Sequence, residues 1–222
     1  KMMDPMSAIN PVGATEAGKG MSDGTTLVAI KYDGGVMIAA DGYSTSGSIV
    51  GNRVSDKLEP IHQRIYCMRS GTSSHTREVA RYVRHYLGIQ ATELGNFPPV
   101  KSAAQVMREV IYNNKGSLSA SMICAGWDPY FGAQLYQVNS EGYFHENNIC
   151  LSGSGSGYIY GLADAEFRGN FTRAEANHFV KKMISHATVR DGSSGGICRI
   201  IDINEAGVNR EYIPYHDLLA HC

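Results

Sequence analysis

The most informative segment of the chain reads Gly24-Thr25-Thr26-Leu27-Val28-Ala29-Ile30-Lys31-Tyr32-Asp33-Gly34-Gly35-Val36-Met37-Ile38-Ala39-Ala40-Asp41. Residues 25–32 have the β-branched and apolar content of a strand, and residues 36–41 have that of a second strand. The tripeptide between them, Asp33-Gly34-Gly35, is a turn signal. The segment therefore predicts a β-hairpin whose first strand, taken as an edge strand, begins at Thr25.

Residues 1–24 differ in composition from the chain that follows. They are rich in Met, Pro, Gly and Ser and show no sustained hydrophobic period, which favours a poorly ordered arm. A chain of 222 residues supports one well-buried domain and hardly two. We therefore expect an arm over residues 1–24 and one domain over residues 25–222.

Strand and helix patterns follow one another along the rest of the chain. Further strands are expected at residues 65–69, 120–125, 133–138, 195–203 and 208–213. Helices are expected at residues 72–87, 103–112, 158–167 and 172–189, the last opening with a Thr172/Glu175 capping box and the third following a Gly/Ser loop at 153–157. This order indicates an α+β fold, either stacked sheets between helical layers or a generic α+β core.

Composition and charge exclude several classes of function. With 43% apolar residues, 18% charged residues and a net charge of −1, the chain lacks the basic surface expected for nucleic-acid or anionic-membrane binding. Its longest apolar run, residues 36–40, is far below the roughly 18 residues of a membrane span, and we expect no secretory leader. Five cysteines without a C-x-x-C pair indicate reduced, intracellular thiols. The absence of an H-E-x-x-H motif argues against a metal enzyme.

The junction between Gly24 and Thr25 has a structural and a chemical interpretation. A threonine that opens a strand is usually only a good strand former. In the chemical interpretation, Thr25 attacks the carbonyl of Gly24, releases the arm and frees its own α-amine. An α-amine has a pKa of about 7.7–8.0, which suits a general base at neutral pH. One residue then supplies both nucleophile and base, and glycine at position 24 accepts a strained backbone there.

Such a site needs a cation and an oxyanion donor. Lys57 is available as the cation, and Asp41, at the end of the second strand, could orient it, although two such residues are by default a solvated pair. The backbone N–H of Gly71, where a strand passes into a helix, is a candidate oxyanion donor. These assignments rest on position alone.

Seven motifs together resemble the β subunits of the proteasome core particle. In order and approximate spacing they are Gly24-Thr25-Thr26, Gly34-Gly35-Val36, Ala40-Asp41, Arg53-Val54-Ser55-Asp56-Lys57, Arg69-Ser70-Gly71, Gly153-Ser154-Gly155-Ser156 and Arg190-Asp191-Gly192-Ser193-Ser194-Gly195-Gly196. The resemblance implies an N-terminal nucleophile hydrolase, a four-layer αββα sandwich. It also implies a threonine-type endopeptidase whose propeptide, residues 1–24, is removed by cleavage between Gly24 and Thr25.

The matching positions assign roles to individual residues. Thr25 becomes the nucleophile, Asp41 and Lys57 support it, and Gly71 donates to the oxyanion. The residues grouped around the threonine amine are Ser154, Asp191 and Ser194.

Within the family the chain resembles the caspase-like catalytic β subunit, which cleaves after acidic residues. Ala125-Gly126-Trp127-Asp128-Pro129 and Tyr158-Ile159-Tyr160-Gly161 support this. One departure is Gly42-Tyr43, where this subunit type commonly has Ser-Arg. The resemblance implies that the substrate is bound by Ser44, Thr45, Arg69, Ser73 and Arg77.

Arg69 gives the specificity a physical basis. Strand alternation places it on the same face as Ile65 and Cys67, where a guanidinium requires an anion or water. The anion is either a structural carboxylate, Glu59 or Glu78, or an acidic side chain of the substrate. Ser73 and Arg77 lie four residues apart on the next helix and so share a face.

The resemblance also implies partners and location. It implies stacked heptameric rings of homologous α and β subunits, polypeptide substrates, no cofactor, and a cytoplasmic and nuclear protein. Two other functions stay open: a non-catalytic β-type subunit that only builds the ring, and a stand-alone amidase of the same fold. A serine-hydrolase elbow at residues 192–196 is rejected because the motif follows a helix and opens a strand, and residues 153–157 lack the ending of a phosphate-binding loop.

Overall fold

The structure, a computed structural model, describes residues 24–46 and 49–222. Its strands are β1 (Leu27–Tyr32), β2 (Gly35–Ala40), β3 (Ser44–Ser46), β4 (Ile49–Asn52), β5 (Leu58–His62), β6 (Ile65–Gly71), β7 (Ala120–Asp128), β8 (Gly132–Val138), β9 (Phe144–Glu146), β10 (Ile149–Ser152), β11 (Cys198–Asn204) and β12 (Gly207–Ile213). Its helices are α1 (Ser73–Leu94), α2 (Val100–Asn113), η2 (Ser154–Tyr158), α3 (Tyr160–Glu166), α4 (Arg173–Arg190), α5 (Tyr215–Leu218) and η3 (Leu219–His221). The arm expected over residues 1–24 lies outside the described residues, apart from Gly24.

Two five-stranded antiparallel sheets form the centre of the molecule. One has the order β10-β1-β2-β11-β12 and the other the order β5-β6-β7-β8-β9, while β3 and β4 make a separate hairpin. The β1–β2 hairpin is confirmed, with Tyr32 paired to Gly35 across the turn. The expectation that β1 is an edge strand is wrong, because β10 pairs with its free side.

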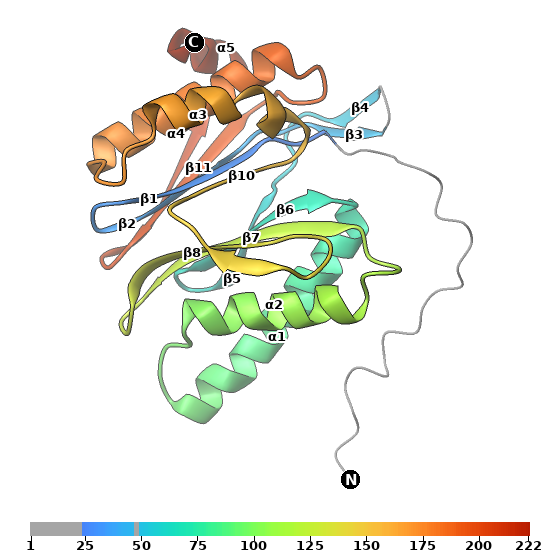
Figure 1. Ribbon diagram of the computed structural model, residues 1–222, viewed down its shortest axis with the longest axis vertical. Coiled ribbons are helices and arrows are strands. Elements are labelled where there is room, and N and C mark those ends of the chain that lie inside the picture. Colours follow the sequence, from blue (N-terminus) through green and yellow to red (C-terminus); the bar gives the residue numbers. More distant parts are fainter. Residues whose placement is uncertain (1–23, 47–48) are drawn as a thin grey trace.

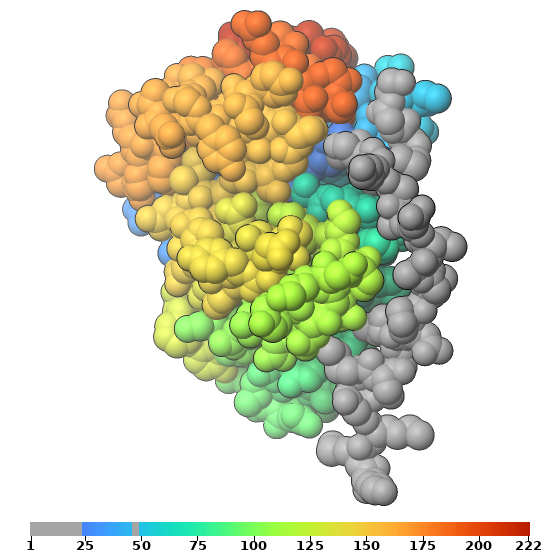
Figure 2. All heavy atoms as spheres, turned by 45° about the vertical axis from the view of Figure 1, so that its right-hand side comes forward, coloured from blue at the N-terminus to red at the C-terminus, as the bar shows by residue number. Residues whose placement is uncertain are grey.

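The sheets lie face to face, and each outer face is covered by helices (Figure 1). α4 packs on β1 and β2, while α1 and α2 pack on the strands of the other sheet. Between the sheets lies an apolar layer that includes Leu27, Ile38, Met68 and Ile123. The helix, sheet, sheet, helix order agrees with the layered arrangement expected above, and Figure 2 shows the helical layers at opposite ends of one packed body.

Covering both faces explains why the first hairpin is so strongly apolar. Along β1, Val28 and Ile30 pack toward α4, whereas Leu27 and Ala29 pack toward the second sheet. Every residue of β2 is buried. A sheet buried on both sides needs continuous apolar strands rather than an alternating pattern, and this is the signal that residues 25–41 carry.

Several elements differ from the sequence-based expectation. The strands β3, β4, β5, β9 and β10 were not expected because they are short, and β5 carries Pro60, which edge strands tolerate. α1 continues to Leu94, where Gly95 ends it in a left-handed conformation with φ 59°. The loop expected at residues 153–157 is instead the 3₁₀ helix η2. The capping box of α4 is confirmed, since Thr172 and Glu175 exchange both hydrogen bonds.

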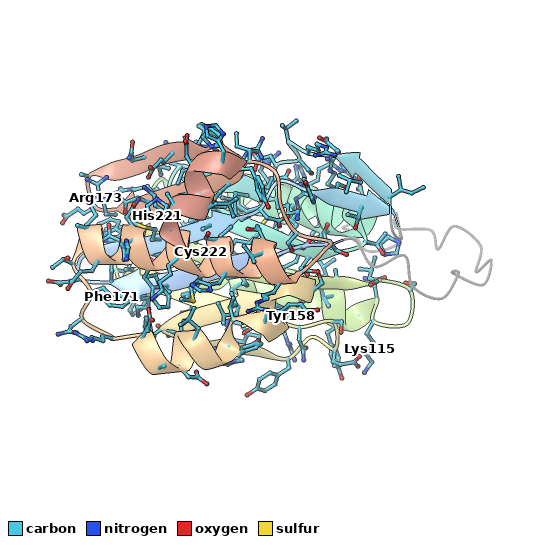
Figure 3. All side chains as sticks on the ribbon, turned by 90° about the horizontal axis from the view of Figure 1, so that it is seen from above. Lys115, Tyr158, Phe171, Arg173, His221 and Cys222 are labelled. Carbon is cyan, nitrogen blue, oxygen red and sulfur yellow. The ribbon has the colours of Figure 1, made fainter. Side chains whose placement is uncertain are left out.

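The end of the chain packs on α4. Figure 3 shows Cys222 and His221 beside this helix, where Ser185 Oγ lies 3.0 Å from Cys222 Sγ and the rings of His178 and His221 are 6.0 Å apart. The C-terminal segment is therefore part of the outer helical layer.

Within the described part of the chain, none of the helices combines the length and apolarity needed to cross a bilayer.

Candidate active site

Strand pairing brings distant parts of the chain to one end of the first sheet. Leu27, which opens β1, pairs with Ala40 at the end of β2 and with Ser152 at the end of β10. Antiparallel neighbours end where β1 begins, so the segments that follow β2 and β10 meet the residues that precede β1. The segments gathered there are residues 24–26, 41–43, 153–155 and 191–196.

Thr25 lies at this meeting point and is almost fully buried, with 3% exposure. Its hydroxyl donates to the carbonyl oxygen of Gly24 over 2.8 Å, and its amide donates to Ser154 Oγ over 3.2 Å. The hydroxyl oxygen is thus held directly beside the peptide bond that links the arm to the domain.

Gly24 fits its place because it has no side chain. A Cβ at this position would lie 2.0 Å from the carbonyl oxygen of Ser193 and 2.3 Å from its Cβ. The close approach of Ser193 therefore favours glycine at position 24. Its amide donates to Thr45 Oγ1 over 2.6 Å.

Lys57 and Asp41 form a buried ion pair with 2.6 Å between Nζ and Oδ1, and their side chains are 7% and 0% exposed. The default expectation that Lys57 and Asp41 form a solvated pair is therefore wrong. The same ammonium donates to the carbonyl oxygen of Gly24 over 3.0 Å. A buried charge requires hydrogen bonds besides its partner, and Asp41 accepts three backbone N–H groups, from Thr26, Tyr43 and Gly195.

A second polar group lies on the other side of Thr25. Ser154 Oγ and Ser194 Oγ both donate to Asp191 Oδ2, over 2.7 and 2.6 Å. Ser194 Oγ also lies 2.8 Å from Thr26 Oγ1. The structure thus brings Ser154, Asp191 and Ser194 together around the backbone nitrogen of Thr25.

A narrow cavity opens beside the hydroxyl of Thr25. Its lining residues are Gly24, Thr25, Tyr43, Ser44, Ser55, Lys57, Arg69, Gly71, Ser73 and Thr76. Gly71 ends β6 with φ 108°, and a Cβ there would lie 2.7 Å from the carbonyl oxygen of Ser119. Both features require glycine, and they place this backbone on the cavity wall.

Arg69 lines the cavity but also has a structural partner. Its Nε lies 3.1 Å from Glu59 Oε2, and its Nη2 donates to the carbonyl oxygen of Asp56 over 2.5 Å. Glu59 is shared with Arg84, at 2.9 Å. Of the two acidic partners considered, Glu59 is therefore the one found. Glu78 pairs instead with Arg81.

Arg77 does not line the cavity beside Thr25, although it shares a neighbouring depression with Arg69. Ser44 and Ser73 line the cavity, and Thr45 contacts Gly24. Arg77 is exposed and lines a neighbouring depression with Arg81, Arg84 and other charged residues. The shared helix face of Ser73 and Arg77 does not bring both to the cavity beside Thr25.

Four of the five cysteines are poor candidates for a nucleophile. All five are free, and all except Cys222 are buried. Burial raises the pKa of the Cys124 and Cys150 thiols to about 12 and also raises those of Cys67 and Cys198, so these thiols stay protonated at neutral pH. Across residues 24–46 and 49–222 no cluster of His, Cys, Asp and Glu is arranged to hold a metal ion.

Comparison with known proteins identifies the family. The model of the family described as "Proteasome subunit" matches residues 21–203. The chain belongs to the proteasome subunit family. Proteasome subunit beta type-6 of Dictyostelium discoideum is 42% identical over 195 residues, covering 88% of this chain and 91% of that protein.

Other relatives are also beta-type proteasome subunits. A probable beta type-1 subunit of Schizosaccharomyces pombe is 41% identical, covering 85% of this chain and 84% of the relative. Beta type-9 of Salmo salar is 38% identical, covering 88% and 89%. The family expected from the seven motifs is therefore confirmed.

Some residues of this proteasome subunit's site were not anticipated from the sequence. Ser55, Thr76 and Tyr43 line the cavity, and Ser193 packs against Gly24. Thr76 lies three residues after Ser73, so helical spacing was a usable signal for it. Ser193 carried none, because its role depends on a backbone contact 169 positions from Gly24.

Proposed function

We propose that this proteasome beta-type subunit is a threonine endopeptidase of the N-terminal nucleophile hydrolase type, with Thr25 as its nucleophile. One observation carries the proposal: the Thr25 hydroxyl and the Lys57 ammonium both donate to the carbonyl oxygen of Gly24, over 2.8 and 3.0 Å. Two hydrogen-bond donors on the carbonyl oxygen make the carbonyl carbon of Gly24 more electrophilic. The attacking atom, Thr25 Oγ, already lies beside this carbonyl group.

The first reaction is removal of residues 1–24. Thr25 Oγ attacks the Gly24 carbonyl carbon and forms a tetrahedral intermediate, whose nitrogen is no longer an amide and takes up the hydroxyl proton. The C–N bond then breaks as an ester forms. Water then hydrolyses the ester, which leaves a carboxylate on Gly24 and a free α-amine and hydroxyl on Thr25. Lys57 stabilises the charge that develops on the carbonyl oxygen, because it already donates to that atom.

The second reaction is cleavage of polypeptides by the freed residue. The α-amine, with an ordinary pKa of about 7.7–8.0, takes the proton of Oγ as it attacks the substrate carbonyl. The amine then protonates the leaving nitrogen, and water hydrolyses the ester. Ser154 and Asp191 hold the nitrogen in place, and the N–H of Gly71 is the proposed oxyanion donor.

We assign this subunit a caspase-like preference for an acidic residue before the cut. Arg69 and Arg84 share the single carboxylate of Glu59, so this trio has one positive charge in excess. Arg69 also lines the cavity beside Thr25. An excess cation at the wall of a small polar cavity favours an anionic side chain. Ser44 and Ser73 add hydroxyl groups to the same wall.

Assembly into the core particle follows from family membership and is part of the proposal. The expected partners are homologous α and β subunits in stacked heptameric rings, in the cytoplasm and nucleus.

The test is the intact mass of this chain in the purified particle, together with cleavage of fluorogenic peptides. The proposal expects a wild-type chain that begins at Thr25 and a Thr25→Ala chain that keeps residues attached before position 25. A wild-type particle that retains Gly24 on this chain and gains no turnover from it would favour the non-catalytic ring subunit. Turnover by the separated, unassembled chain would favour the stand-alone amidase.

A further inference from the structure

Tyr43 contacts both Asp41 and the glycine pair Gly195–Gly196. It follows Asp41 by two residues, donates its amide to Asp41 Oδ2 over 3.1 Å, and lines the cavity beside Thr25. This position is half of the Gly42-Tyr43 departure seen in the sequence, and none of the roles assigned above uses its side chain.

The Tyr43 ring covers the glycine pair that ends the segment 191–196. A Cβ added at Gly195 would lie 2.8 Å from ring atom Cε2, and one added at Gly196 would lie 2.9 Å from ring atom Cδ1. Gly196 has φ 75°, a conformation that favours glycine. The ring thus occupies the space that two side chains would take, in direct contact with the backbone.

Arg53 also contacts the ring. Its guanidinium carbon lies 5.6 Å from the centre of the Tyr43 ring, and Nη1 lies 3.4 Å from the hydroxyl oxygen. The carbonyl oxygen of Arg53 also approaches Gly196, where an added Cβ would lie 2.3 Å away. An aromatic ring with a cation within about 6 Å of its centre is stabilised in place.

Segment 191–196 is held by polar contacts and not by apolar packing of its own side chains. It reads Asp-Gly-Ser-Ser-Gly-Gly and brings no apolar side chain to a core, and glycine has the most conformational freedom to lose on folding. Backbone bonds fix it at one edge, through Gly195 N to Asp41 and Gly42 N to the Gly195 carbonyl. The Tyr43 ring packs across both Gly195 and Gly196, and the Arg53 carbonyl oxygen approaches Gly196 as well.

We propose that Tyr43 is a positioning residue that braces segment 191–196 and thereby holds Asp191 beside Ser154 and Ser194 beside Thr26. The ring, rather than the hydroxyl, supplies the brace. The effect on turnover rests on the proposed function, whereas the effect on the segment's mobility does not.

The experiment compares Tyr43→Phe and Tyr43→Ala in the assembled particle. The matched control is Tyr212→Ala, which removes another ring beneath an arginine, 5.8 Å from Arg199 and 53% exposed. Two quantities are measured: amide hydrogen exchange of residues 191–197, and kcat and KM for a peptide with Glu before the cut. Tyr43→Leu, which keeps apolar volume without a flat ring, replaces Tyr43→Ala if that chain does not assemble.

The brace predicts faster exchange of residues 191–197 in Tyr43→Ala and unchanged exchange in Tyr43→Phe and the control. It also predicts that kcat falls roughly tenfold in Tyr43→Ala, because catalytic groups are misplaced, while KM of this variant stays within about twofold of wild type. In Tyr43→Phe both kcat and KM stay within about twofold of wild type. Equal exchange in Tyr43→Ala and wild type overturns the brace, as does a loss confined to KM. If wild-type particles show no Thr25-dependent turnover, the proposed function fails, and the exchange data still decide the brace.

Discussion

Lys57 Nζ lies 2.6 Å from Asp41 Oδ1, with both side chains almost wholly removed from water. The pair joins the end of β2 to the segment before β5, and the ammonium reaches on to the bond between arm and domain. One buried cation therefore contacts both the folded core and the bond that the proposed reaction breaks.

Replacing Lys57 by Ala is expected to stop both arm removal and peptide turnover, because no other cation in the cavity lining contacts the Gly24 carbonyl. It also leaves the Asp41 carboxylate buried without its counter-charge, at a cost of up to about 3–5 kcal/mol. The three N–H groups that Asp41 accepts keep the loss toward the lower end. Thermal unfolding measures the loss of stability, chain mass shows whether the arm is retained, and peptide cleavage measures turnover.

The matched control is Lys31→Ala, which removes a lysine from a partly exposed pair with Glu146 at 3.4 Å. It should cost less than about 1 kcal/mol and leave turnover intact. Lys57→Arg should fail with Lys57→Ala, since a guanidinium has a different shape and does not release its proton. Near-normal turnover in either Lys57 variant contradicts the assigned role.

Asp41→Asn is expected to fall between wild type and Lys57→Ala. The amide keeps one oxygen for the Thr26 N–H but loses the charge opposite Lys57. Turnover at several pH values checks this, because the variant changes the electrostatic environment of the ammonium. Activity and stability equal to wild type would show that the ion pair contributes to neither.

Thr25→Ala should keep the arm, and Thr25→Ser should release it. Alanine has no oxygen to attack the Gly24 carbonyl, whereas serine has one but lacks the methyl group that restricts the rotamer. We therefore expect slower processing and altered kcat in Thr25→Ser, measured by mass and by peptide cleavage. Processing of Thr25→Ala at the same bond, in a particle without other active subunits, would exclude self-cleavage.

Gly24→Ala should impair processing by displacing the junction from Ser193. The added Cβ would have to move away from backbone atoms 2.0–2.6 Å distant, and a shift of about 1 Å in reacting groups can cost a hundredfold in rate. Gly192→Ala is the control, because a Cβ there meets nothing within 4 Å. Arm release is followed over time by mass. Equal rates for the two variants would show that the close contact has no role.

Arg69→Met should abolish preference for acidic residues while Thr25 still matures. The variant removes a charge from the cavity wall and leaves Glu59 paired with Arg84, so the remaining group is neutral. Arg81→Met, which removes an arginine 74% exposed, is the control. Arg77→Met should resemble this control, because Arg77 does not line the cavity.

The measurement for Arg69 is a panel of peptides that differ only in the residue before the cut, with Thr25→Ala particles as background. Equal cleavage of acidic peptides by wild type and Arg69→Met would assign Arg69 to structure alone, through Glu59. A loss of preference in Arg77→Met equal to that in Arg69→Met would show that its side chain reaches the substrate.

The sequence predicted the first hairpin and the helical layers well because burial on both faces leaves a strong apolar signal, as in β2. It missed β9 and β10, short strands whose pairing depends on distant neighbours. Among site residues, Lys57 and Asp41 were found through motif spacing, but spacing cannot tell a buried pair from a solvated one. That difference is set by tertiary packing.

Arg69 and Arg77 show how far sequence spacing can place a side chain. Strand alternation placed Arg69 correctly, with Ile65 and Cys67 packed on the helical side of their sheet. Helical spacing grouped Arg77 with Ser73, yet only Ser73 lines the cavity. Four residues along a helix rise about 6 Å, which is enough to carry a side chain from one depression to the next.

The Thr25 nitrogen is a peptide amide, bonded to Gly24 and donating to Ser154. An amide nitrogen has no basic lone pair, so under the proposed function a chain in this state cleaves only its own Gly24–Thr25 bond and no other molecule. Each competent site is then created together with one molecule of released arm. The number of released arms therefore equals the number of working sites. Titration of the particle with an irreversible inhibitor gives an independent count of the sites for comparison.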